Sequence, residues 1–379
     1  MTASNPFADP PAAGPASDPP SFARFWLGTA LGLVATLGCV WALPFSPYIA
    51  WQQAEGTQMF HARWIYERLN FDPHPIDVAL VGSSRFEAGL SAPVLAAELS
   101  RSLRRPVHVA NLSLVMPGRD FSDRIVEELL AKHPEVRLVV LSNDGDVVNS
   151  HPMFRETASF AQLLDAPLVI NTKYATNLLA APYRNLANFA KARFPDWFGL
   201  TTRFRPERYA GTDLDRSRGY QLPDGEAING DIVMPPAELA LSSRSAIARQ
   251  RAGLAWLRHV PDRWRLAIDR RYVASIAARA RAARVRLAFV ALPVFGPDQS
   301  PGSDAFYRRF GPAFSLAGLA TQPAYFQNGV HLNRQGALAA SVLAARALRQ
   351  QTAQALGNEP VSPADQAHPD HQQGGDHGS

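Results

Sequence analysis

Val78-Ala-Leu-Val-Gly-Ser-Ser-Arg85 is an apolar run that stops at Gly82 and is followed directly by two serines. A short continuous apolar run of this kind is typical of a strand buried on both faces of a parallel sheet. In open α/β sheets, ligands bind beyond the carboxyl ends of the strands. The stretch therefore predicts an α/β fold with a serine hydroxyl at the ligand-binding edge of its sheet.

A partner for such a hydroxyl occurs near the other end of the chain, in Asn328-Gly-Val-His-Leu-Asn333. A serine is a weak nucleophile until an adjacent base accepts its proton, and histidine is the usual base. Asn328 lies three residues before His331 and has a side chain that can orient the imidazole. The two stretches together predict a serine nucleophile activated by His331.

Strand-like and helix-like patterns alternate along the rest of the chain. After the strand at 76–81, further strands are predicted at 107–112, 136–141 and 285–292, and helices at 92–103, 123–132, 267–283 and 334–348. Such alternation indicates a parallel sheet with right-handed crossovers and helices on its faces. The expected fold class is therefore α/β.

A long segment, residues 149–265, separates the third predicted strand from the fourth. Its first part has a helical pattern rich in aromatic side chains, whereas residues 204–236 are polar and rich in turn formers. A segment of that length is not structureless inside a compact domain. We expect an inserted lid or cap beside the site, with a docking surface for a partner protein as the alternative.

Residues 25–45 contain no charged side chain and are long enough to cross a bilayer as a helix. Trp26 and Trp41 lie near the two ends of this segment, and Arg24 precedes it, which predicts an N-terminus inside the cell. A cleaved signal peptide is the alternative, but no clear small-x-small cleavage site follows. The segment 51–68 is predicted as an amphipathic helix whose aromatic side chains rest on the membrane surface or pack against the body.

The chain divides into four parts on composition. Residues 1–24 and 351–379 are rich in Pro, Ser, Gly or Gln and are expected to be disordered tails around the membrane segment and a folded body at 46–350. The only cysteine, Cys39, lies in the membrane segment, so the body can form no internal disulfide.

The charge pattern excludes several classes of function. The net charge of +5 is not gathered into a basic run with interleaved aromatic residues, so nucleic-acid binding is not expected. No Gly-rich phosphate loop is present. Three histidines of the C-terminal tail, His368, His371 and His377, lack a fixed geometry, and we expect neither a metal site nor a cofactor.

The serine and histidine stretches resemble two blocks of the SGNH, or GDSL, hydrolase superfamily, and among its branches the membrane-anchored bacterial proteins that transfer acyl groups to cell-surface polysaccharides. The resemblance covers about residues 76–150 and 265–348. It implies a flavodoxin-like three-layer sandwich around a parallel sheet. Gly82-Ser83-Ser84 corresponds to the family's Gly-Asp-Ser, which makes Ser84 the expected nucleophile and puts Ser83 in place of the aspartate.

The other blocks imply the remaining site residues. Gly118, in Asn111-Leu-Ser-Leu-Val-Met-Pro-Gly118, matches the second-block glycine, and Asn143, in Leu141-Ser-Asn-Asp144, matches the third-block asparagine. The resemblance implies an oxyanion hole formed by the N–H groups of Ser84 and Gly118 and by the Asn143 amide. Arg85 and Arg119 stand next to block residues and are expected to bind an anionic sugar or the oxyanion.

Asn328 stands where the family usually has the aspartate of Asp-x-x-His, so the carboxylate that stabilises a histidine cation is missing or is supplied by Asp144 or Asp146. The resemblance implies an O-acyl esterase or transferase, most simply for acetyl groups, in the inner membrane with its body in the periplasm. Expected partners are a polysaccharide and a membrane-bound acyltransferase or synthase. The alternative is a catalytically silent domain that binds glycan or scaffolds a synthesis complex.

Overall fold

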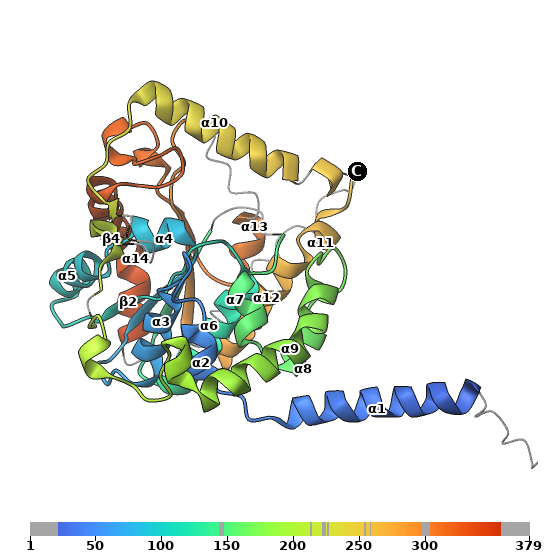
Figure 1. The fold of residues 1–379 in the computed structure, drawn as a ribbon. Coiled ribbons are helices and arrows are strands. Elements are labelled where there is room, and N and C mark those ends of the chain that lie inside the picture. Colours follow the sequence, from blue (N-terminus) through green and yellow to red (C-terminus); the bar gives the residue numbers. More distant parts are fainter. Residues whose placement is uncertain are drawn as a thin grey trace, which may run out of the picture.

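The computed structural model describes residues 22–143, 148–212, 214–221, 225, 227–253, 255–257, 259–297 and 304–357. Among these residues, five strands form one sheet in which every pairing is parallel. They are β1 (Val78–Val81), β2 (Val109–Asn111), β3 (Leu138–Ser142), β6 (Arg286–Ala291) and β7 (Ala313–Ser315). The predicted α/β class and parallel sheet are confirmed (Figure 1).

The strand order is β2-β1-β3-β6-β7. The chain moves outward from β1 to β2, then returns past β1 to β3 and continues in the opposite direction. In doubly wound sheets, this reversal opens a crevice beyond the carboxyl ends of the two central strands, and ligands bind there. The turn at Gly82, which directly follows β1, is therefore at the position where the topology favours a site.

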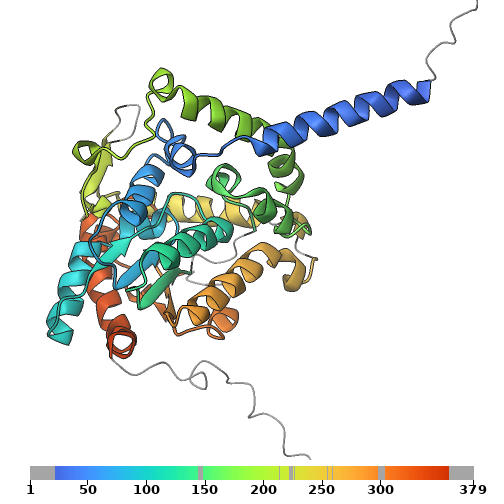
Figure 2. The same ribbon diagram turned by 90° about the horizontal axis from the view of Figure 1, so that it is seen from below.

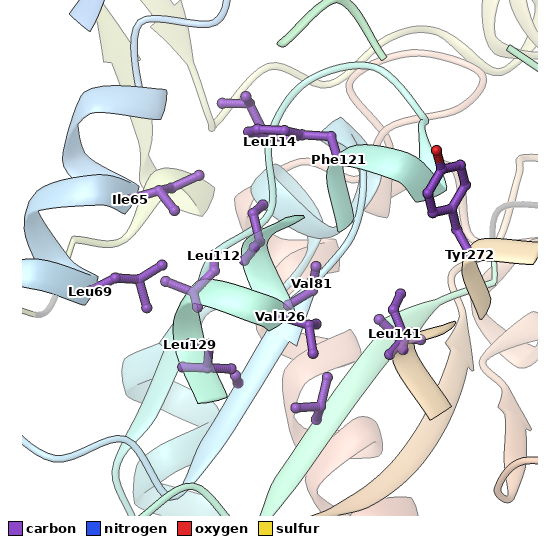
Figure 3. Close-up of a cluster of buried hydrophobic side chains, with 14 of the residues drawn as sticks. Ile65, Leu69, Val81, Leu112, Leu114, Phe121, Val126, Leu129, Leu141 and Tyr272 are labelled. Atoms are coloured by element: carbon purple, nitrogen blue, oxygen red, sulfur yellow. The ribbon is translucent and has the colours of Figure 1, made fainter. Parts of the chain in front are cut away.

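Helices cover both faces of the sheet (Figures 1 and 2). Alternate strand residues belong to two separate buried clusters, with Ala79 and Val81 in one and Val78 and Leu80 in the other. The first cluster includes side chains of α6 (Arg119–Lys132) and α12 (Ala267–Ala282), and Figure 3 shows part of it. The second includes α5 (Ala92–Leu103) and α14 (Arg334–Leu356), so the central strands β1, β3 and β6 are buried on both faces, as their apolar runs predicted.

Two helices differ by several residues from the sequence prediction, and one strand was not predicted. α6 begins at Arg119 rather than at 123, because its first turn is buried although it carries charged side chains. α14 continues to Leu356 rather than to 348. β7, a three-residue edge strand, was not predicted, since so short a run carries no measurable alternation.

The 149–265 segment does not form one compact unit. Its helices are α7 (Pro152–Thr157), α8 (Phe160–Asp165), α9 (Tyr174–Arg193), α10 (Pro236–Gly253) and α11 (Asp262–Arg265), with an antiparallel pair of β4 (Gly219–Gln221) and β5 (Ala227–Asn229). In Figure 1, α10 crosses the top of the molecule, whereas α8 and α9 lie at the lower right, beside the end of α1. Short elements complete the described chain: α4 (Ser84–Gly89), α13 (Asp304–Tyr307) and 3-10 helices at Pro195–Phe198, Pro206–Arg208, Arg216–Arg218, Ala255–Leu257, Ala317–Leu319 and Pro323–Tyr325.

The N-terminal helix α1 (Phe22–Ala42) is apolar, projects from the body and is long enough to cross a membrane. The helix predicted at 51–68 is instead two helices, α2 (Pro47–Gln52) and α3 (Ala62–Asn70). Trp51 and Trp64 are buried in the first core cluster. Of the two alternatives for these aromatic side chains, packing against the body is therefore correct.

Candidate active site

Ser84 and His331 meet at the carboxyl edge of the sheet. Ser84 is the first residue of α4, and the Ser83 hydroxyl, which caps this helix, accepts a hydrogen bond from the Arg85 N–H at 3.3 Å. The Ser84 Oγ lies 2.9 Å from Nε2 of His331. Both side chains are half-buried. The structure thus brings together the predicted nucleophile and base from opposite ends of the body.

Asn328 fixes the orientation and the tautomer of this histidine. Its Oδ1 accepts hydrogen bonds from the backbone N–H groups of Val330 and His331, both at 3.0 Å, so the oxygen of the amide faces the ring. The same oxygen lies 3.2 Å from His331 Nδ1. Because a carbonyl oxygen only accepts, Nδ1 carries the proton and the lone pair of Nε2 faces Ser84. This is the tautomer that a general base requires.

Helix α10 holds the loop that carries Asn328 and His331. The Gly329 N–H donates to the Ser242 hydroxyl at 3.1 Å, and a Cβ added at Gly329 would lie 2.2 Å from the Ser243 nitrogen. The Ser243 hydroxyl donates to the Phe295 carbonyl at 2.7 Å, and the Phe295 N–H donates to the Gly329 carbonyl at 3.0 Å. One element of the 149–265 segment therefore contacts the site loop directly, and a glycine is required there because two backbones touch.

The ends of the three neighbouring strands are joined around Gly82. A Cβ at Gly82 would lie 2.6 Å from the Ser142 side chain at the end of β3, and the Gly82 carbonyl accepts from the Leu114 N–H at 3.1 Å. Asn143, the residue after β3, is buried and donates its N–H to the Val290 carbonyl at 2.8 Å. The predicted Ser84 and Asn143 positions therefore follow adjacent strands that pair directly.

Gly118 is the N-cap of α6, and its backbone is extended, with φ at −179°. The glycine is needed for close approach rather than for an unusual dihedral angle, since an added Cβ would lie 2.3 Å from the His151 Cβ. His151 is therefore in contact with a predicted site residue, although it was not itself predicted.

His151 supports the loop that carries Gly118. Its Nε2 donates to the Val115 carbonyl at 2.8 Å, its Nδ1 accepts from the Met153 N–H at 3.1 Å, and its ring stacks on Phe121 at 4.7 Å. Burial lowers the pKa of His151 to about 4. The ring is therefore neutral and held in one tautomer. Its position depends on residues distant in sequence, so no local pattern could have revealed it.

Replacing His151 by glutamine is expected to flatten the pH dependence of stability. A histidine whose folded-state pKa is lowered from 6.5 to about 4 stabilises the fold above pH 6.5 and loses that contribution as the pH falls towards 4. Between pH 7 and pH 5 the wild-type protein should lose roughly 2 kcal/mol of unfolding free energy through this group. Over the same pH range, the unfolding free energy of the variant should fall by about 2 kcal/mol less than that of the wild type. Urea unfolding of both proteins at pH 7 and at pH 5 gives the measurement.

Two features make this comparison specific to His151. Asp120, whose pKa is raised to about 6 by burial, changes stability in the opposite direction but is present in both proteins. The other titratable groups are likewise present in both proteins, so the difference between the two pH dependences reports on position 151. If the unfolding free energy of the His151→Gln variant fell between pH 7 and pH 5 by as much as that of the wild type, the neutral, buried state of the ring would be contradicted.

The two arginines predicted to bind a ligand lie in different environments. Arg119 is 2% exposed, pairs with Asp269 at 2.9 Å and also donates to the Ser142 carbonyl. Its side chain therefore lies in the core, and the ligand-binding role expected for it stays a prediction. Arg85 is half-buried and donates to the carbonyl of Leu292 just after β6, so it lies close to the nucleophile in sequence and in space.

A second buried ionic group lies under α4. Glu87 accepts from His61 Nδ1 at 2.7 Å and from Arg216 at 3.2 Å, and Arg216 also donates to the Asn111 carbonyl at the end of β2. The Arg216 guanidinium lies 5.3 Å from the centre of the Trp64 ring. Through Arg216, the 149–265 segment is tied both to the helix that begins with Ser84 and to the strand before Gly118.

The remaining predicted positions fall outside the described residues. These are Asp144 and Asp146, the three tail histidines, the 1–21 part of the N-terminal tail and residues 358–379. Within the described residues, no cluster of three or more His, Cys, Asp or Glu side chains has metal-binding geometry.

No protein-family model matches this sequence, and no curated protein matches it. The chemistry of the Ser84 and His331 pair and its surroundings is therefore the basis for a proposed function.

Proposed function

We propose that the protein is a membrane-anchored acyl-transfer enzyme of the SGNH type, with Ser84 as its nucleophile. The observation that carries the proposal is the 2.9 Å contact between the Ser84 hydroxyl and Nε2 of His331, whose other nitrogen faces the Asn328 oxygen. A nucleophile, a base and an orienting group in series are what covalent catalysis by serine requires. The location beyond β1, at the reversal of the strand order, adds topological support.

In the first half-reaction, His331 Nε2 takes the Ser84 proton as Oγ forms a bond to the ester carbonyl carbon. The carbonyl electron pair moves onto oxygen, and the resulting tetrahedral intermediate collapses by breaking the bond to the sugar oxygen. Nε2 returns the proton to that oxygen, which leaves as an alcohol. The product is an acyl group on Ser84.

In the second half-reaction, water or another sugar hydroxyl gives its proton to Nε2 and attacks the acyl carbon. Collapse then breaks the bond to Ser84, which regains its proton from Nε2. Water makes the enzyme an esterase, and a sugar hydroxyl makes it a transferase. In both cases, the proposed oxyanion donors are the N–H groups of Ser84 and Gly118 and the Asn143 amide, on segments that follow β1, β2 and β3.

The proposed setting is the inner membrane, with the N-terminus inside and the body in the periplasm. It is supported by the length and apolarity of α1 and by Arg24 near its N-terminal end. The proposed fold is the flavodoxin-like SGNH sandwich, with α10 as the part of the insertion that caps the site. The proposed substrate is an O-acetylated exported polysaccharide, with a membrane-bound acyltransferase or synthase as partner and no cofactor.

A second candidate is a catalytically silent glycan-binding or scaffold subunit. It is favoured by Asn328, because a neutral amide stabilises a histidine cation less than a carboxylate does. The two candidates differ in whether Ser84 is reactive.

Reactivity and topology can be measured in one experiment on spheroplasts that contain the full-length protein. A membrane-impermeant fluorophosphonate should label the protein, with the added mass on the peptide that contains Ser84, because His331 activates this hydroxyl. Labelling only by a permeant probe would contradict the periplasmic location. No labelling of a folded protein by either probe would favour the silent candidate.

Replacing Asn328 by aspartate is expected to raise the rate of acetyl ester hydrolysis by at least about tenfold, or roughly 1.4 kcal/mol of barrier. A carboxylate can still accept both backbone hydrogen bonds of the loop, and its charge stabilises the imidazolium that forms as Ser84 attacks. The measurement is kcat for a simple acetyl ester, with the thermal unfolding midpoint as the control for folding. A lower rate in a folded variant would mean that another carboxylate already serves His331.

A further inference from the structure

Large apolar side chains are exposed around the end of α1. They belong to α8, to the loop after it and to the N-terminal half of α9, and we call them the anchor-side patch: Phe160, Leu164, Leu168, Val169, Leu179 and Tyr183. Leu168, Leu179 and Tyr183 are 69%, 81% and 76% exposed. A group of this kind on a soluble surface marks an interaction site.

The burial pattern of α9 is reversed relative to a helix on a water-facing surface. Its buried side includes Asn177, Arg184, Asn185 and Asn188, while its exposed side carries Leu179 and Tyr183. The Arg184 guanidinium donates to the Arg155 and Ala158 carbonyls at 2.7 and 2.6 Å and also to the Asn185 Oδ1. A helix that pairs polar groups inside and exposes apolar ones outside is suited to an apolar surrounding.

The patch lies where α1 joins the body, and several contacts fix this junction. The ring of Trp41, in the last turn of α1, lies 4.1 Å from the ring of Phe160, a member of the patch. After α1, the Ser46 N–H donates to the Asn188 Oδ1 at 2.8 Å, and the Asn188 amide donates to the Ser46 carbonyl at 3.0 Å. Figures 1 and 2 both show α9 beside the body end of α1.

Basic side chains adjoin the patch. The lining of a cavity of about 770 Å³ beside α8, α6 and α12 includes Leu168 and Val169 together with Arg263, Trp264 and Arg271. Arg263 is exposed and stacks over the Trp264 ring at 5.6 Å, and Arg271 contacts Asp165. Apolar side chains next to arginines and a half-exposed tryptophan match the boundary between acyl chains and anionic headgroups.

We propose that the anchor-side patch rests on the outer surface of the bilayer that α1 crosses, with Leu168 and Leu179 at the level of the upper acyl chains and Arg263 at anionic headgroups. The inference rests on the proposed membrane anchoring by α1. It gives the body one fixed face towards the membrane, rather than free rotation on a flexible stalk. Contact with the membrane surface, which was one of the two alternatives for residues 51–68, is thereby assigned to α8 and α9.

The single native cysteine permits a site-specific test on the full-length protein. In a Cys39→Ser background, Leu168→Cys and Leu179→Cys variants are labelled with an environment-sensitive fluorophore and placed in nanodiscs of phosphatidylethanolamine and phosphatidylglycerol. A fraction of the lipids carries a spin label near the headgroup end of the acyl chain. Leu241→Cys, on α10 and 61% exposed, is the matched control away from α1.

We expect lipid spin labels to quench both patch positions at least about twofold more strongly than the Leu241→Cys control. Equal quenching at all three positions would overturn the inference. A fluorophore at the patch that is shielded from water but not quenched by lipid would also overturn it, because protein and not lipid would then cover the patch. Fluorophore on native Cys39 reports anchoring separately. If lipid quenches the fluorophore at Cys39 but not at the patch, α1 is anchored in the membrane and only the docking of the patch is refuted. If lipid does not quench the fluorophore at Cys39, both the anchoring by α1 and the docking of the patch are refuted.

Discussion

Replacing Ser84 by alanine is expected to lower kcat/KM for hydrolysis of a simple acetyl ester by at least about 10³-fold. The variant loses the oxygen that lies 2.9 Å from His331 Nε2, and no acyl intermediate can then form. Alanine is a good residue for the first turn of a helix and leaves the Ser83 cap in place, so the fold should be retained. Steady-state kinetics with the purified full-length protein give the measurement.

Ser83→Ala is the matched control for this substitution. Ser83 is 4% exposed, and its hydroxyl caps α4, so its removal should cost about 1 kcal/mol of stability while most of the activity remains. A large loss of activity from Ser83→Ala and not from Ser84→Ala would exchange the roles of the two serines.

The double variant Ser84→Ala/His331→Ala adds a test of whether the two residues act together. Groups that act as one unit give effects that do not add, so the double variant should be no slower than Ser84→Ala alone. Additive losses would mean that His331 contributes to the reaction independently of Ser84.

The sheet could be predicted because its strands are buried on both faces. Runs such as 78–81 are apolar throughout, and the helix at 92–103 has its own start signal, in which Ser91 caps the first turn before Pro93. These signals are local, and all four predicted strands are present. β7 carries no comparable signal, because its three residues at the sheet edge are only partly buried.

The site was predictable only where its residues are marked by short patterns. Ser84 follows an apolar strand, and Asn328 and His331 share one loop, so their types and spacing are visible in the sequence. His151 and Arg216 act through partners distant in the chain, and nothing nearby distinguishes them from other polar residues. The position of Arg119 next to Gly118 likewise says nothing about the direction of its side chain, which is turned into the core and pairs with Asp269.

The 149–265 segment shows how tertiary contacts divide one stretch of sequence between two roles. Its aromatic first part was expected beside the site, yet α8 and α9 lie at the end of α1. The part that contacts the site loop is α10, which has no aromatic side chain and touches it through Ser242 and Ser243. Small residues that permit close backbone approach leave little trace in a single sequence.

Replacing Gly329 by alanine is expected to lower kcat for ester hydrolysis by about 10²-fold, because catalytic groups displaced by an ångström lose that much rate. The added Cβ would lie 2.2 Å from the Ser243 nitrogen and 2.5 Å from its Cα, which are backbone atoms of α10 that cannot rotate away. Either the loop or α10 must shift, and the loop carries both Asn328 and His331. The measurement is kcat with the thermal unfolding midpoint.

Gly318→Ala is the matched control, because a Cβ at Gly318 has no atom within 4 Å, and that variant should retain wild-type activity. Ser242→Ala separates the clash from the hydrogen bond, since it removes only the acceptor of the Gly329 N–H and should cost less activity than the added methyl group. A Gly329→Ala protein with full activity would show that His331 tolerates movement of its loop. The contact with α10 would then stabilise the fold without positioning the base, and the proposed role of α10 at the site would have to be abandoned.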